Sequence, residues 1–424
     1  MYSCIISEKG PVAMMILYEI KKVLSSRGGK ITLLVFACVI AVSCWMATLG
    51  VEWMNESGEW ETGRDAVRKL RTARQEWAGA LDEEKLAEVI VELNRITAMP
   101  AYSSTDYLQR NLVHCRLQAI KPIREMLVFA YSPGFQTVDE TVADRLTPAD
   151  AASFYDNRLR LLKEGIYDES KMISRLLSER EKQYLISEYE KLETPFYYDY
   201  MEGWEQMLSN SYALILYGAL VLGFLVAGIF SNEYKWKADA VFFSSLFGRD
   251  KATASKIKAG FLLVTLLYWI GVLVYTLFTL CFLGFDGGNC PIQLSYWKSF
   301  YNLTYVEAYL LAVAGGYIGN LFVAFLSMWV SAKTRSSVVA VTIPFIVIML
   351  PGMLRGSSIL WLNKLIALLP DQLMQVCNVI QNLDTYDLGF TVIKRVPILF
   401  AVYSILTILL VPFLYIAYRR KSWC

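Results

Sequence analysis

The sequence predicts an all-α membrane protein with six transmembrane helices, an N-terminal amphipathic elbow helix and a large helical extracellular domain between spans one and two. Of its 424 residues, 55 % are hydrophobic and 19 % are charged, and the mean hydropathy is +0.37. This apolar surplus exceeds what a soluble protein of this size buries, so part of it must face lipid. The composition excludes a disordered chain, a disulfide-stapled mini-protein and a nucleic-acid-binding protein.

Six apolar windows, none containing Asp, Glu, Lys or Arg, approach or exceed the roughly 20 residues that cross a bilayer. They cover residues 31–49, 211–230, 260–285, 308–330, 338–354 and 396–418. The remaining segments are a cytoplasmic N-terminus (1–30), the extracellular domain (50–210), a cytoplasmic loop (231–259), an extracellular loop (286–307), a cytoplasmic hairpin (331–337), a second extracellular loop (355–395) and a cytoplasmic tail (419–424).

The distribution of charge predicts the orientation of these spans. Basic residues gather in residues 1–30, 231–259, 331–337 and 419–424, whereas residues 51–210 carry about 29 acidic and about 20 basic side chains. Because Lys and Arg resist translocation, both termini are predicted to be cytoplasmic in a multi-pass protein of the cell membrane. Residues 41–44 loosely resemble a lipoprotein cleavage site, but cleavage there would leave five spans and misplace the basic tail.

Two further segments are predicted to be helices at the membrane surface. In the N-terminal segment, Ile16, Ile20 and Val23 share one helical face, with Glu19, Lys21 and Lys22 opposite, which is typical of an elbow helix lying on the inner leaflet. The alternative is a short cytoplasmic helix packed on protein. Residues 359–374 are apolar but interrupted by Lys364 and Pro370, which indicates a re-entrant or interfacial helix, or a surface helix packed on the bundle.

The acidic block of residues 50–210 is predicted to be a helical domain with its own core. Its apolar residues recur at spacings of three and four, as in Leu86, Val89, Ile90 and Leu93. Thr147 with Asp150, and Ser178 with Glu181, have the pattern of capped helix starts. A block of this length is long enough to close a core without lipid.

Within the spans, Asn320 needs a hydrogen-bond partner inside the bundle. Two rows of small residues permit close helix approach, and packing within the chain is favoured over a dimer interface for both. The rows are Gly315 with Gly319, and Ala219 with Gly223 and Ala227.

The sequence offers no catalytic, cofactor-binding or metal-binding residues. It has one histidine, His114, and no zinc, serine-hydrolase or phosphate-loop motif, so any ATP would be hydrolysed by a partner. Among eight cysteines, Cys290 and Cys377 are the better candidates for a single extracellular bridge, but buried free thiols are the favoured interpretation.

The segment most suggestive of function lies between spans two and three. Its sequence, SNEYKWKADAVFFSSLFGRDKATASKIKA, begins at Ser231. It combines an acid just past a span with a short aromatic helix, a serine pair, Gly-Arg, and a lysine entering the next span. A solvated linker would explain the charges but not the aromatic side chains, which could seat a short helix on a soluble partner. From the residues alone, the linker and the docking interpretations both stay open.

This pattern, within this topology, resembles the ABC-2 type permeases, the membrane subunits of ABC exporters. In that family an acid, a Ser or Pro before Gly or Ser with Arg, and a Lys mark the loop after span two, and Glu233, Ser244, Ser245, Gly248, Arg249 and Lys256 match them. The family's Gly-Thr is not matched, since Ala238, Asp239 and Ala240 stand there.

The resemblance implies that this loop holds a coupling helix which docks onto a separate cytoplasmic ATP-binding cassette subunit. The docking residues would be Glu233, Lys235, Trp236, Lys237, Ala240, Phe243, Ser244, Ser245, Leu246, Gly248, Arg249 and Lys256. It further implies a second permease subunit, identical or different, with ATP and Mg²⁺ bound only by the partner.

The function expected from this resemblance is export or extraction of an amphipathic substrate such as a peptide, antibiotic or lipid. The substrate-binding residues are unknown. The alternative is a membrane receptor or sensor, in which the extracellular domain binds a ligand and the loop signals to a cytoplasmic protein.

Overall fold

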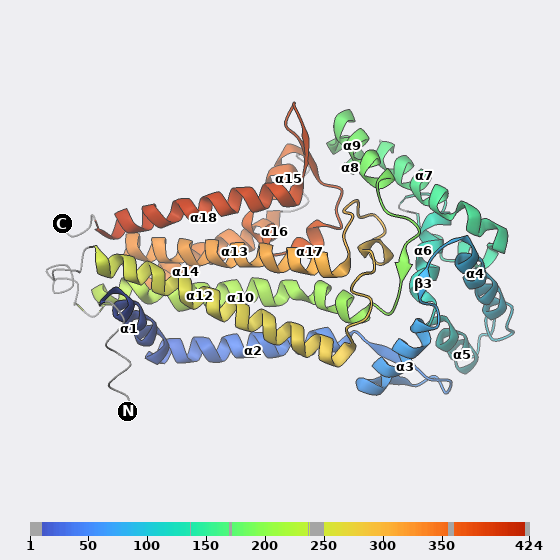
Figure 1. The fold of residues 1–424 in the computed structure, drawn as a ribbon, viewed down its shortest axis with the longest axis horizontal. Coiled ribbons are helices and arrows are strands. Elements are labelled where there is room, and N and C mark those ends of the chain that lie inside the picture. Colours follow the sequence, from blue (N-terminus) through green and yellow to red (C-terminus); the bar gives the residue numbers. More distant parts are fainter. Residues whose placement is uncertain are drawn as a thin grey trace.

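A computed structural model describes residues 11–135, 137–168, 172–235, 237, 250–354 and 360–419. The chain is mostly helical, at 74 %. A bundle of long helices lies beside a domain of shorter helices, which is attached at one end of the bundle (Figure 1). We call that end the domain end and the opposite one the basic end.

Within the described residues, six helices are long and apolar enough to cross a membrane, in agreement with the predicted number of spans. They are α2 (Arg27–Leu49), α10 (Glu202–Lys235), α12 (Lys251–Leu283), α13 (Tyr305–Thr334), α14 (Ser337–Leu354) and α18 (Arg395–Arg419). Helix α10 begins well before its apolar window, because its first turns belong to the domain end and bury polar residues there. Figure 1 shows the start of α2 and the last turn of α18 at the same end of the bundle.

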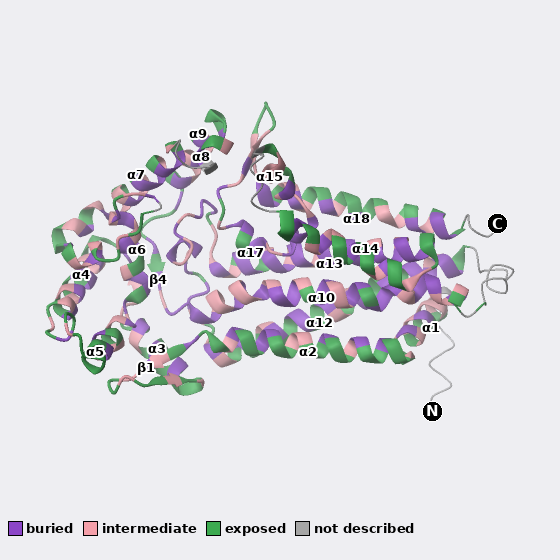
Figure 2. Ribbon diagram, turned by 180° about the vertical axis from the view of Figure 1, so that it is seen from behind, coloured by how far each residue is buried: buried purple, intermediate pink, exposed green. Residues whose placement is uncertain are grey.

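Helices α10 and α13 form the centre of the bundle. About two thirds of the apolar window of α10 is buried, against 22 % in α14 and in α18, whose outer faces carry exposed Leu, Ile and Phe (Figure 2). Asn320 on α13 donates to the backbone oxygens of Ile215 and Gly316, so its amide has the predicted partner inside the bundle.

Both rows of small residues serve packing within the chain. A Cβ on Gly223 would lie 3.1 Å from Val323 of α13, and one on Gly315 would lie 2.8 Å from Val376. These glycines therefore allow neighbouring elements to approach closely, as the favoured interpretation expected.

The N-terminal helix α1 (Pro11–Ser25) packs on α12 and then turns into α2. Ser26 separates the two helices, and its Oγ accepts a hydrogen bond from the Gly29 amide at 2.9 Å. The predicted polar face was wrong for Glu19, which is only 8 % exposed, whereas Leu17 is 49 % exposed. Glu19 turns inward because Lys256 of α12 and Lys22 of its own helix lie there, as described below.

The domain consists of helices wrapped around an apolar core. Leu86, Val89, Ile90 and Leu93 are all fully buried, which confirms the predicted stripe. Its elements are α3 (Arg64–Gln75), α4 (Glu83–Thr97), α5 (Tyr107–Leu117), α6 (Lys121–Tyr131), the 3-10 helices η1 (Val142–Arg145) and η2 (Pro148–Ser153), α7 (Phe154–Tyr167), α8 (Met172–Leu176) and α9 (Glu179–Glu190).

Both predicted capping boxes are formed. Ser178 and Glu181 open α9 as expected, with the Ser178 amide donating to the Glu181 carboxylate at 2.7 Å. Thr147 and Asp150 also cap each other, but they open the short η2, and α7 begins only at Phe154.

The prediction of an all-α chain needs a small correction, because three two-stranded antiparallel pairs are present in the described residues. They pair β1 (Glu52–Met54) with β2 (Trp60–Thr62), β3 (Gly79–Ala80) with β4 (Tyr197–Tyr198), and β5 (Thr385–Asp387) with β6 (Val392–Lys394). Such two- and three-residue strands are too short to leave a periodic signal in the sequence.

The described residues of the connections at the domain end form short helices and the β5–β6 hairpin. They contain η3 (Ile292–Leu294), α15 (Leu360–Ile366), α16 (Pro370–Leu373) and α17 (Val376–Val379). The predicted helix over residues 359–374 is therefore broken, with Pro370 starting a new turn. Cys290 and Cys377 are buried free thiols, as favoured.

Candidate functional site

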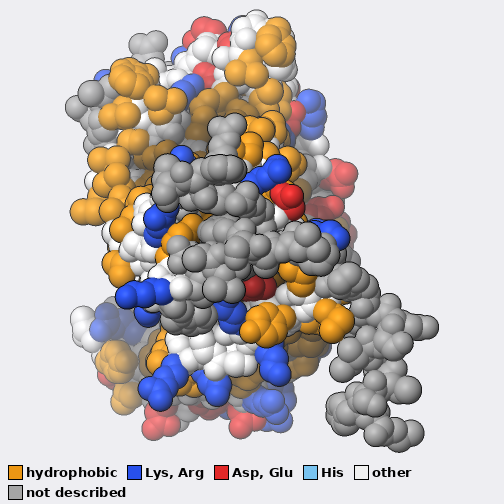
Figure 3. All heavy atoms as spheres, turned by 90° about the vertical axis from the view of Figure 1, so that its left-hand side faces the viewer, with side chains coloured by type: hydrophobic (Ala, Val, Ile, Leu, Met, Phe, Trp, Pro, Cys, Tyr) orange, Lys and Arg blue, Asp and Glu red, His pale blue; other side chains and the backbone are white. Residues whose placement is uncertain are grey.

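The candidate site lies at the basic end of the bundle, where α10 ends and α12 begins. Figure 3 looks directly onto this end and shows Lys and Arg side chains distributed over it. The predicted coupling segment connects these two helices. Of its predicted docking residues, Trp236, Ala240, Phe243, Ser244, Ser245, Leu246, Gly248 and Arg249 lie outside the described residues.

The other predicted docking residues fall into two groups. Lys235 and Lys237 are exposed at the end of α10. Glu233 and Lys256, by contrast, are buried within the helix ends, with exposed fractions of 4 % and 0 %. These two side chains face each other in this structure, and their contact with a partner stays a prediction.

Lys256 is held by acceptors from two other helices. Its Nζ donates to Glu233 Oε1 at 2.7 Å, to Glu19 Oε2 at 3.1 Å and to the backbone oxygen of Ile229 at 3.1 Å. A lysine ammonium has three N–H groups, so three oxygens can satisfy it completely. Burying an ammonium is costly in free energy unless it is paired and hydrogen-bonded in this way.

Lys22 of α1 completes what we call the four-charge cluster, made of Glu19, Lys22, Glu233 and Lys256. Its Nζ lies 2.5 Å from Glu233 Oε1 and 3.6 Å from Glu19 Oε2. Two carboxylates and two ammonium groups make the cluster neutral. It joins α1, α10 and α12 at the base of the predicted coupling segment.

The electrostatics of Lys22 reflect this pairing. Partial burial opposes its charged form, but the hydrogen bond and charge of Glu233, together with the charge of Glu19, outweigh burial and raise the pKa of Lys22 above its usual value. The Lys22 ammonium therefore stays charged throughout the physiological range.

The other end of the segment is also attached to the bundle. Asp250, just before α12, accepts a hydrogen bond from the Tyr415 hydroxyl at 3.0 Å and lies 3.0 Å from the Arg419 guanidinium of α18. The flanks of the predicted coupling segment thus contact α1 on one side and α18 on the other.

A hollow of about 480 Å³ opens beside the cluster, between α2, α10 and α14. One part of its lining is apolar, with Phe224, Val338 and Val341, and another is polar, with Asn232 and Lys235. This combination suits a molecule that has both an apolar body and a polar group.

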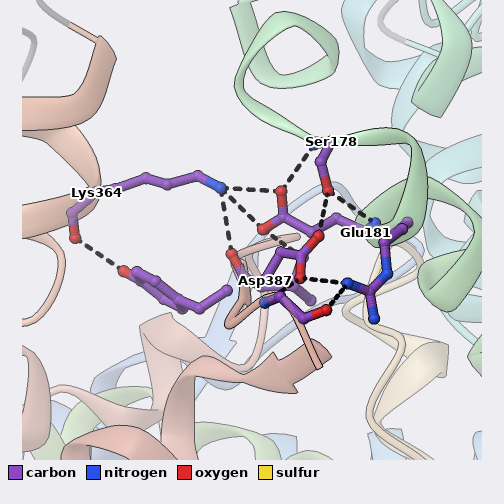
Figure 4. Close-up of polar contacts among 8 residues, drawn as sticks. Ser178, Glu181, Lys364 and Asp387 are labelled. Atoms are coloured by element: carbon purple, nitrogen blue, oxygen red, sulfur yellow. Dashed lines mark hydrogen bonds and ion pairs between the residues drawn. The ribbon is translucent and has the colours of Figure 1, made fainter. Parts of the chain in front are cut away.

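At the opposite end, an ion-pair seam attaches the domain to the bundle (Figure 4). Glu181 of α9 is 1 % exposed and accepts two hydrogen bonds from Lys364 of α15, at 2.8 and 3.0 Å. Nearby, Asp387 of the β5–β6 hairpin accepts from Ser178 and Arg180, both at 3.2 Å. Lys364, which interrupts the predicted apolar helix, therefore serves the domain contact.

Further contacts support this seam. Arg158 of α7 is buried, donates to the backbone oxygen of Trp297 at 2.8 Å and stacks over Phe196. Burial lowers the pKa of Arg158 to about 10. Arg74 of α3 lies 3.1 Å from Glu202, which begins α10, so the domain is also tied directly to that central helix.

Sequence reasoning missed Glu19 and Lys22 as site residues. Both belong to the predicted elbow helix, where a surface helix would expose them. The available signal was Glu19, one of only two acids, with Glu8, among the otherwise basic residues 1–30.

In the part of the chain that the structure describes, no group of three His, Cys, Asp or Glu side chains is arranged to hold a metal ion. The chain matched no family model, no curated protein and no solved structure. Six apolar helices indicate a multi-pass helical membrane protein, and this is the class that the fold defines.

Proposed function

We propose that this chain is the membrane-spanning permease subunit of an ABC transporter of the ABC-2 type. It would export or extract an amphipathic substrate, and a separate cytoplasmic ATP-binding cassette subunit would hydrolyse the ATP. In this proposal the basic end is cytoplasmic, the domain is extracellular, and a second permease subunit, identical or different, completes the transporter.

The observation that carries the proposal is the buried contact between Glu233 and Lys256. These two residues match the family pattern at either side of the loop, and the contact brings them together at 2.7 Å. A segment that receives force from an ATPase must be fixed at its base, because a loosely held loop would move without moving the helices. The four-charge cluster provides such a base on α1, α10 and α12.

The hollow beside the cluster supports the substrate class. It is lined by both apolar and polar side chains and lies between helices whose outer faces are apolar. An amphipathic molecule could place its apolar part against Phe224 and Val341 and its polar part near Asn232.

The receptor alternative draws on the seam at the domain end. Ion pairs from Glu181 and Asp387 link the domain to the elements that precede α18, and a ligand-binding domain would need such links to signal. The same links would serve a transporter whose domain gates substrate release, so the seam alone does not favour sensing.

The proposal is tested by co-expressing the full chain with an ATP-binding subunit encoded in the same genome, followed by purification through a tag on this chain. We expect the ATPase to co-purify, and its activity in proteoliposomes to rise when an amphipathic substrate is added. Co-purification of a histidine kinase with no ATPase would contradict transport and favour the receptor.

A further inference from the structure

Helix α3 carries an unusual concentration of positive charge for its surroundings. Its twelve residues include Arg64, Arg68, Lys69, Arg71 and Arg74 and a single acid, Asp65, for a net charge of +4. The block of residues 51–210 to which it belongs is acidic overall, with about 29 acids and about 20 bases. This local reversal of sign calls for a physical explanation.

The spacing of the arginines places three of them on one face. Arg64, Arg68 and Arg71 follow each other at intervals of four and three, so they form a stripe along the helix, and all three are exposed. The neighbouring face, with Val67 and Leu70, is buried against Leu283 of α12 and Tyr200. The apolar face thus fixes α3 on the bundle and directs the arginines outward.

Helix α3 lies beside the last turns of α12 (Figure 1). Together they line a hollow of about 380 Å³, formed by the three arginines, Val67 and residues 280–285. The Arg64 guanidinium lies over the Phe282 ring, 5.7 Å from its centroid. The hollow therefore has cationic groups on one wall and apolar groups on the other.

Helix α12 places this hollow at a defined depth in the membrane. An exposed stripe runs along it at helical spacing and ends in the hollow, through Leu266, Ile270, Leu273, Leu277 and Cys281. In a bilayer this stripe faces acyl chains, and α12 ends at Leu283. The arginines of α3, which lie beside the end of α12, are thus at the depth where the hydrocarbon ends and the headgroups begin.

Nearby acids neutralise the stripe only in part. Arg71 pairs with Asp286 at 2.7 Å, and Arg68 with Asp65 at 3.0 Å, the latter between side chains that are 73 % and 76 % exposed. A pair so exposed contributes little and can exchange for another anion. Arg64 has no carboxylate partner among the described residues, so the hollow keeps a net positive charge.

We propose that this hollow binds the phosphate of an anionic phospholipid in the leaflet at the domain end. Arg64 and Arg68 would contact the phosphodiester, while the acyl chains follow the exposed stripe of α12. The charge complementarity and the depth together select a membrane lipid over a soluble anion. The inference rests on the chain spanning a membrane and is independent of transport.

The test uses the full chain in nanodiscs that contain a phosphatidylglycerol carrying a photoreactive headgroup, compared with phosphatidylcholine bearing the same group. After illumination, adducts on peptides covering residues 64–74 and 276–286 are quantified by mass spectrometry. We expect preferential labelling by phosphatidylglycerol. Each arginine near an anionic membrane surface contributes about 1 kcal/mol to lipid affinity, which is roughly fivefold. Removing two of them in Arg64→Gln with Arg68→Gln should therefore lower labelling roughly thirtyfold.

Three comparisons keep the result specific. Arg160→Gln with Lys163→Gln, on α7, removes one exposed and one half-buried positive charge and should leave labelling unchanged. Arg64→Lys with Arg68→Lys keeps the charge and should retain most of it, while peptides at the basic end serve as an internal standard for folding. Equal labelling by both lipids, full labelling of the glutamine variant, or complete displacement by inorganic phosphate would each overturn the proposal.

Discussion

Lys256 and Glu233 stand 23 positions apart, at opposite ends of a polar loop, yet their charged groups meet at 2.7 Å with almost no exposure to solvent. Glu19 reaches the same ammonium from a third helix. The end of α10 and the start of α12 are therefore joined by a buried electrostatic contact that also includes the N-terminal helix.

Replacing Lys256 with methionine should strongly destabilise the basic end. The substitution leaves Glu19 and Glu233 sharing one ammonium, that of Lys22, and breaking a buried pair typically costs about 3 to 5 kcal/mol. The free energy of unfolding, measured by denaturant titration in mixed micelles, should fall by about 3 kcal/mol. Lys258→Met, two residues further on α12 and exposed, is the matched control. An equal, small effect of both variants would contradict the importance of the cluster.

The predicted coupling helix gives a second test. If Phe243 anchors in the ATPase, Phe243→Ala should weaken binding by about 2 kcal/mol, or roughly thirtyfold, because interface anchors typically contribute that much. Arg249→Glu should uncouple ATP hydrolysis from transport while insertion continues, since one reversal leaves the positive-inside bias intact. Affinity is measured by pull-down titration with the ATP-binding subunit.

Lys251→Ala is the control for this test, because an exposed charge at the rim mainly tunes the association rate. Wild-type transport by the Phe243→Ala, Arg249→Glu double variant would refute docking through this segment. That result would support the simple-linker or the receptor interpretation.

At the domain end, Lys364→Met should loosen the seam. The Glu181 carboxylate, 2 % exposed, would lose its bidentate partner, while its remaining contact with the Ser178 amide keeps the cap. Because Lys364 is itself 30 % exposed, we expect a cost of about 2 kcal/mol, below that of a fully buried pair. Hydrogen exchange should speed up in α9 and β5. Arg180→Gln removes a more exposed ion pair and should change hydrogen exchange little. Identical exchange profiles for the Lys364→Met and Arg180→Gln variants would show that the buried pair contributes no more than the exposed one.

Acid should weaken the same seam through Glu188. Its partial burial favours the neutral form, but hydrogen bonds from Lys191 at 2.8 Å and Lys394 at 2.6 Å outweigh this and lower the pKa of Glu188 below its usual value of 4.5. Between the two values the unfolded chain binds more protons, so stability rises with pH. The contribution is complete above about pH 4.5 and is lost as pH falls through the lower, folded-state pKa.

The measurement is thermal stability in detergent from pH 3 to pH 6. Glu188→Gln should reduce the loss of thermal stability between pH 4.5 and pH 3. Lys394→Met should also reduce this loss, because it removes one of the two donors to Glu188. A Glu188→Gln profile that runs parallel to the wild type throughout would show that this carboxyl does not contribute.

The spans were predictable because runs of apolar residues report directly on lipid exposure, and the caps of α9 were predictable because Ser178 and Glu181 form a local pattern. The four-charge cluster was not predictable, since its members come from helices whose mutual rotation is set by packing. Glu19 illustrates this point. Helical periodicity assigned it to a polar face, but that face meets Lys256 instead of water.

Lys364 illustrates the same limit at the other end. As a charge within an apolar stretch, it suggested a helix at the membrane surface. Its partner, Glu181, lies 183 positions away, and no local pattern could connect the two.

Helix α10 runs unbroken for 34 residues, about 51 Å at 1.5 Å per residue, well beyond a hydrocarbon core of roughly 30 Å. Its first turn holds Arg74 of the domain through Glu202, and its last turn holds Lys256 through Glu233. A continuous helix has no hinge, so it rotates about its axis as one rigid body. Any rotation of α10 therefore moves Glu202 and Glu233 together and changes both ion pairs at once, which couples the two surfaces of the membrane mechanically.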